Sequence, residues 1–146
     1  MLELIFVIVV IGILVAVSLP KLAATRDDAK ISTLAQNTMT AATEIAAYTV
    51  AKGETEDDLS KMSTAIKQMV ESGDATLATR EADIQWKGVS DCLVLKVTHY
   101  NSGPIQGEVL VVEANGSGSN AGCDRLRSLI DTQRFPIPLR GHLISY

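Results

Sequence analysis

The chain has 146 residues, which is enough for one globular domain and too few for a large multidomain protein. Apolar residues make up 47% and charged residues 21%, so the composition excludes general disorder. The net charge of −4 argues against a surface that binds a nucleic-acid backbone, which needs a basic patch. Hydropathy is unevenly distributed, because residues 1–20 carry a single charge, that of Glu3.

Residues 4–19 are almost entirely apolar, with only Gly12 and Ser18 as interruptions. As a helix, residues 1–19 would reach about 29 Å, close to the hydrocarbon thickness of a bilayer. A cleavable signal peptide would carry basic residues before its apolar run, and here the first basic residue is Lys21. We therefore expect this segment to insert into a membrane or to be buried in an equally apolar assembly.

Glu3 is the unusual residue of this segment. A carboxylate among apolar side chains is costly to bury unless it has a partner or a proton. So close to the start of the segment, Glu3 could lie near lipid headgroups, where the cost is small. In the alternative interpretation, it pairs with a cation that another chain supplies. The spacing of the residues leaves both interpretations open.

Three features occur together near the start of the chain: the sequence Met1–Leu4, the Ile/Val/Leu run, and the mutual spacing of Glu3, Gly12 and Pro20. Together they resemble the N-terminal segment of mature type IV pilins and of the related type II secretion pseudopilins. The resemblance covers about thirty residues, and beyond them it concerns architecture only. Family members usually begin with a methylated Phe and a small polar residue before the position of Met1. We therefore expect this sequence to be a processed form, numbered from its third residue.

The resemblance implies a single-span precursor in the bacterial inner membrane that a prepilin peptidase processes. The pilus assembly machinery then extracts it into a helical homopolymer, an extracellular filament on the cell surface. Glu3 would be the assembly residue, paired with the terminal amine of a neighbouring copy. Gly12 and Pro20 would mark where the stalk bends or opens. We expect no cofactor, no metal and no nucleic-acid partner of the single subunit, and the sequence does not distinguish roles in retraction, adhesion, DNA uptake or electron conduction.

An amphipathic helix is predicted from residue 22 to about residue 51, because apolar residues recur there at spacings of three and four. Neither Pro nor Gly occurs from Lys21 to Lys52, so we expect stalk and helix to form one long, bent helix that ends at Gly53. The chain is thus predicted to have a stalk, residues 1–23, and a globular head, residues 24–146. The apolar face of the helix in the head comprises Ile31, Leu34, Thr38, Ala41, Ile45 and Tyr48.

The fold class predicted for the chain is α+β, with the long helix packed on a small antiparallel sheet, similar to a type IV pilin. A second helix is expected over residues 59–70, with Asp57 or Asp58 as its N-cap. A cation site in the acidic run 54–58 is the alternative, but the run lacks the spacing of a calcium loop. Strands are predicted at residues 84–86, 92–100, 108–114 and 142–146, a hairpin between the second and third of them, and a short helix at residues 124–134.

Cys92 and Cys123 are the only cysteines. An even pair of cysteines in a domain outside the cytoplasm favours a disulfide. Because the stalk places the head there, we expect a disulfide rather than two buried free thiols. The bond would close a loop of about thirty residues and contribute about 3–4 kcal/mol in the chain-entropy model.

The function expected from these features is that of a structural subunit of a type IV pilus, not an enzyme. No catalytic or phosphate-binding motif occurs, and His99 and His142 are far apart in the sequence. A minor pilin or a type II secretion pseudopilin, built alike, is the first alternative. A membrane-anchored periplasmic binding domain is the second, and Glu3 argues against it because a simple anchor has no use for a carboxylate.

Overall fold

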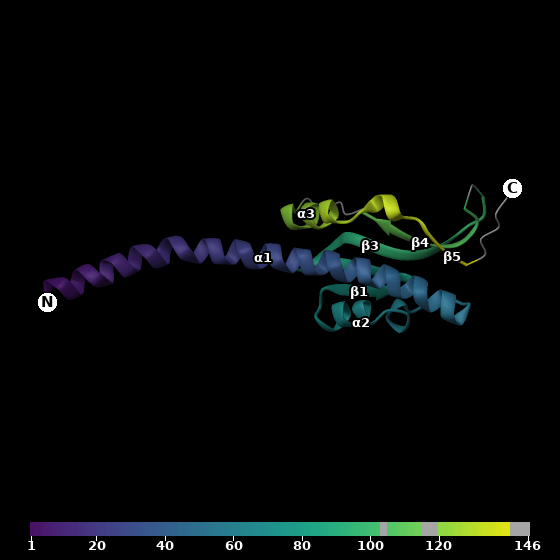
Figure 1. The fold of residues 1–146 in the computed structure, drawn as a ribbon, viewed down its shortest axis with the longest axis horizontal. Coiled ribbons are helices and arrows are strands. Elements are labelled where there is room, and N and C mark those ends of the chain that lie inside the picture. Colours follow the sequence, from purple (N-terminus) through teal and green to yellow (C-terminus); the bar gives the residue numbers. More distant parts are fainter. Residues whose placement is uncertain (103–104, 115–119, 141–146) are drawn as a thin grey trace. The chain divides into compact units, whose positions relative to one another are not determined.

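The computed structural model describes residues 1–102, 105–114 and 120–140, apart from the side chains of residues 17–23. The chain forms two compact units, Met1–Lys30 and Ile31–Tyr146. Helix α1 (Leu2–Lys52) belongs to both units and is continuous in its backbone (Figure 1). Hydropathy places the end of the stalk after residue 23, whereas the tertiary contacts of the head begin at Ile31.

The predicted amphipathic helix is confirmed in the second unit. Its apolar face is buried from Ile31 to Ile45, and only Tyr48, at the far end of this face, is half-buried. Helix α1 ends after Lys52 because Gly53 adopts a φ of 74°, the left-handed conformation that stops helices. One helix therefore joins the apolar segment to the head, as the absence of Pro and Gly after Lys21 predicts.

The second predicted helix is split into the 3-10 helix η1 (Leu59–Lys61) and the α-helix α2 (Thr64–Glu71). Each of the two helices has its own N-cap, Asp58 for η1 and Ser63 for α2. The carboxylate of Asp58 accepts a hydrogen bond from the backbone N–H of Ser60 at 2.9 Å, and Ser63 Oγ accepts one from the N–H of Ile66 at 3.1 Å. The capping interpretation of Asp58 is confirmed, but for η1 only.

Within the described residues, five strands form one antiparallel sheet in which the strand order follows the sequence. The hairpin predicted between the two long strands is confirmed: strand β3 (Val89–Tyr100) pairs with strand β4 (Gly107–Glu113), in register from Val94↔Glu113 to Tyr100↔Gly107. The strands are β1 (Ala75–Ala78), β2 (Glu81–Trp86), β3 (Val89–Tyr100), β4 (Gly107–Glu113) and β5 (Ile137–Arg140).

The two edge strands differ from the sequence prediction. Strand β1 was not predicted, because the short run Ala-Thr-Leu-Ala has little β-branched character. Strand β5 includes Pro138 and lies at an edge, where a residue without an N–H group is tolerated. The strand predicted at residues 142–146 lies outside the described residues.

One cluster of buried side chains joins α1 to the sheet. Alternate residues of β3, among them Leu93, Leu95 and Val97, contribute to it from one face of the sheet. Helix α3 (Ala121–Leu129) adds Cys123 and Leu126 to the same cluster. The head is therefore an α+β unit with a single core.

The helix predicted at residues 124–134 begins earlier and ends earlier than expected. Asn120 is its N-cap and accepts a hydrogen bond from the N–H of Gly122 at 2.8 Å, so α3 starts at Ala121. After Leu129 the chain leaves the helix, and residues Thr132–Arg134 form the separate 3-10 helix η2.

Candidate functional site

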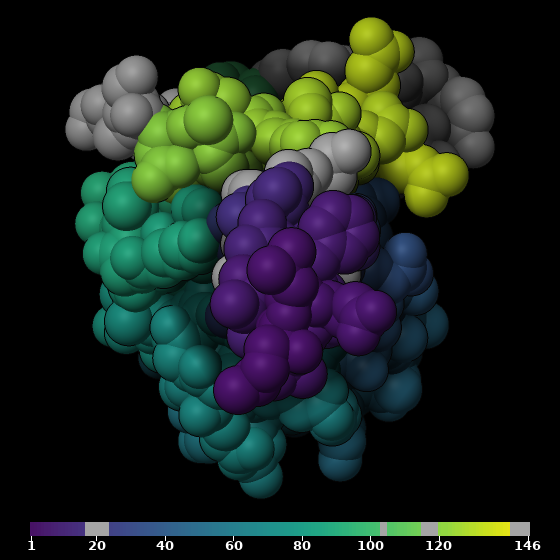
Figure 2. All heavy atoms as spheres, turned by 90° about the vertical axis from the view of Figure 1, so that its left-hand side faces the viewer, coloured from purple at the N-terminus to yellow at the C-terminus, as the bar shows by residue number. Residues whose placement is uncertain are grey.

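The apolar segment of the first unit exposes its side chains. Every large apolar residue from Met1 to Val15 is exposed, from 39% at Val10 to 99% at Met1. Figure 2 shows the first of these side chains, in purple, projecting on several sides of the helix. A continuous apolar surface of this extent is unfavourable in water. It therefore needs contact with an apolar partner or with lipid.

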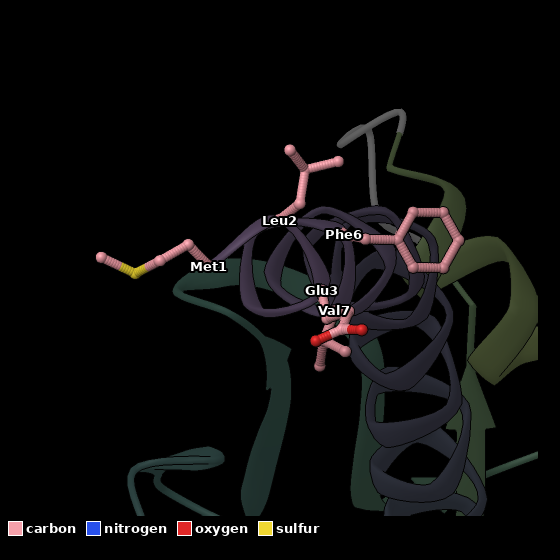
Figure 3. Close-up of a pocket in the computed structure, with 5 residues that line it drawn as sticks. All are labelled: Met1, Leu2, Glu3, Phe6 and Val7. Carbon is pink, nitrogen blue, oxygen red and sulfur yellow. The ribbon is translucent and has the colours of Figure 1, made fainter.

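Glu3 lies among these side chains near the start of α1. An open hollow of about 610 Å³ is lined by Glu3 and its neighbours Met1, Leu2, Phe6 and Val7 (Figure 3). The carboxylate of Glu3 is on the same side of the helix as Val7, whereas Phe6 and Leu2 point in other directions. Within the part of the chain that the structure describes, no ion pair involves Glu3.

The first residues of α1 and the preceding Met1 supply all of this lining, so the hollow does not enclose a ligand. The position of Glu3 in the first turn of α1 places a negative charge at the positive end of the helix dipole, which is favourable. The arrangement offers one acidic group surrounded by apolar surface. Such a surface suits association with another apolar helix that brings its own cation.

Gly12 and Pro20, predicted as points where the stalk bends or opens, both lie within α1. Gly12 is exposed, and a Cβ atom added there would meet no atom within 4 Å. Pro20 belongs to residues 17–23, whose side chains lie outside the described residues. Their proposed role in bending therefore stays a prediction.

The structure contains the disulfide between Cys92 and Cys123. Both cysteines are completely buried, with their Cα atoms 4.9 Å apart. The bond attaches α3 to the start of β3. Arg127 strengthens the same attachment, because its Nε donates a hydrogen bond to the carbonyl oxygen of Cys92 at 2.8 Å and its Nη2 donates to that of Asp91 at 3.2 Å.

A polar cluster that the sequence did not predict fixes the loop after α1 to the sheet. Arg80 Nη2 lies 2.5 Å from Glu108 Oε1 and donates a hydrogen bond to Thr55 Oγ1 at 2.8 Å. Thr55 Oγ1 in turn donates to Glu108 Oε2 at 3.0 Å. Partial burial works against ionisation of Glu108, but the hydrogen bonds from Arg80 and Thr55 outweigh it, so the pKa of this carboxyl lies below its ordinary value.

The cluster joins residues far apart in the sequence, which is why no local pattern indicates it. Arg80 follows β1 and adopts a φ of 61°, whereas Glu108 lies in β4 and Thr55 follows α1. Arg80 and Thr55 both favour the ionised form of the Glu108 carboxyl. The cluster fixes the loop after α1 and the end of β1 to strand β4.

No metal site is found in the described part of the chain, where no group of three or more His, Cys, Asp or Glu side chains is placed to hold an ion. The acidic run 54–58 instead forms local contacts: Asp58 caps η1, and Glu56 Oε1 accepts a hydrogen bond from the hydroxyl group of Tyr48 at 3.2 Å.

In comparisons with known proteins, the chain matches no family model, no curated protein and no solved structure. Over the described residues, none of the helices combines the length and the apolar character needed to cross a membrane.

Proposed function

We propose that this chain is the structural subunit of a type IV pilus filament and that copies assemble through the apolar segment at the start of α1. The observation that carries the proposal is the continuous exposure of large apolar side chains from Met1 to Val15, with the single carboxylate of Glu3 among them. Copies of this helix can replace lipid around it at little cost, since lipid and apolar side chains provide similar environments.

The construction of the head supports the proposal. Among the described residues, the buried core includes residues from Ile31 onward and none from the first unit, so we expect the head to fold without the apolar segment. A filament subunit needs one part that associates with other copies and a second part that folds by itself. The apolar helix and the head fit these two roles. We infer that the segment resides in the bacterial inner membrane before assembly and in the filament core afterwards, with the head outside.

Glu3 supports self-assembly over plain anchoring. A lone carboxylate opposes burial in any apolar environment unless a cation meets it. In the filament, the terminal amine of a neighbouring copy would supply that cation and fix the axial register of the two helices. The proposal assigns no enzymatic activity and no cofactor to the chain.

The test is assembly of the purified full chain when detergent is removed. We expect filaments of uniform width by negative-stain electron microscopy, and recovery of the chain in the pellet after centrifugation. Residues 27–146, which lack the apolar segment, are the matched control and should stay in the supernatant. A full chain that remains monomeric, or that forms only amorphous aggregates, would contradict the proposal. Filaments formed equally by residues 27–146 would also contradict it, because the apolar segment would then not be the assembly element.

A further inference from the structure

We draw no further inference here: the strongest candidate, the open hollow of about 400 Å³ beside the edge strand β1 that Asp57, Asp58 and Leu77 help to line, is an acidic cluster in which Asp58 already caps η1, and among the described residues no second feature points to a ligand for it.

Discussion

Glu3 differs from its neighbours in charge and not in exposure, so replacing it with Gln removes the charge and keeps the size. In Glu3→Gln we expect membrane insertion to survive or improve, because an amide is less costly to bury than a carboxylate. Filament yield should fall roughly tenfold or more, because breaking a buried ion pair costs several kcal/mol and the loss recurs with every added subunit. Both fractions are measured from the same cells, as protein in the inner membrane and in sheared filaments.

The matched control for this change is Glu71→Gln, the same replacement at an exposed residue at the end of α2. It should leave filament yield unchanged. Normal yield from Glu3→Gln would remove the pairing role and favour a plain membrane anchor. If Glu71→Gln lowers the filament yield to the same extent, the loss of yield is not specific to the apolar segment.

The lowered pKa of the Glu108 carboxyl makes the stability of the head depend on pH. Its pKa is lowered in the folded state, so its contribution is present above the unfolded value of about 4.5 and is lost as the pH falls through the lower folded value. We expect the free energy of unfolding to drop by about 1–2 kcal/mol more in the parent than in Glu108→Gln between about pH 5 and pH 3. Urea titrations at each pH measure this difference. If the free energy of unfolding depends on pH in the same way in both proteins, the Glu108 carboxylate does not contribute to this pH dependence.

The side chain of Trp86, and not the backbone conformation, requires glycine at position 122. A Cβ atom there would collide with Nε1 of Trp86, an indole that is only 4% exposed and has little room to move. We expect Gly122→Ala to destabilise the head by about 1–3 kcal/mol through overpacking. The same change in a Trp86→Leu background should cost much less, and equal costs in the two backgrounds would show that the clash with Trp86 is not the cause.

At the scale of secondary-structure elements, the disulfide and Arg127 together hold α3 against β3. The native protein should therefore show no alkylation of Cys92 or Cys123 and should yield one linked peptide pair in non-reducing mass spectrometry. Unfolding followed by reduction, with both thiols then blocked, should lower the stability of the refolded head by about 3–4 kcal/mol. Two thiols that react freely in the native protein would contradict this account.

The elements that the sequence predicted well are those with a strong local pattern. Helix α1 has a long apolar stripe and a Gly stop, and β3 and β4 have long runs of alternating or β-branched residues. Strand β1 is four residues long and rich in Ala, and β5 carries Pro138, so neither has a local pattern typical of strands. Both acquire their conformation by pairing with a longer neighbour, and such non-local pairing is not encoded in a short run of sequence.

The same distinction applies to the candidate site. Glu3 could be singled out from sequence because it is the one charge in an apolar run, and the pairing of Cys92 with Cys123 because no other cysteine exists. The cluster of Arg80, Thr55 and Glu108 could not be predicted, since its members come from two loops and a strand that are far apart in the sequence and are ordinary surface residue types. Only the tertiary fold brings these three side chains together.

At the scale of the whole molecule, the two compact units predict independent folding of the head. The buried core begins at Ile31, so residues 27–146 should unfold with the same midpoint temperature as the head within the detergent-solubilised full chain, to within about 2 °C. Circular dichroism at increasing temperature measures both, with residues 27–146 also studied in the same detergent as a control. A midpoint lower by 10 °C or more in the truncated protein would show that the apolar segment supports the head.

The central claim is that the apolar segments of many copies pack together when the chain assembles. Electron cryo-microscopy of the filaments formed by the full chain tests it most directly. We predict that helices of residues 1–16 lie side by side at the filament axis, with each Glu3 within ion-pair distance of a cation from a neighbouring copy and the heads on the outside. A map in which these helices remain separate from one another, with the heads alone holding the filament together, would contradict the account.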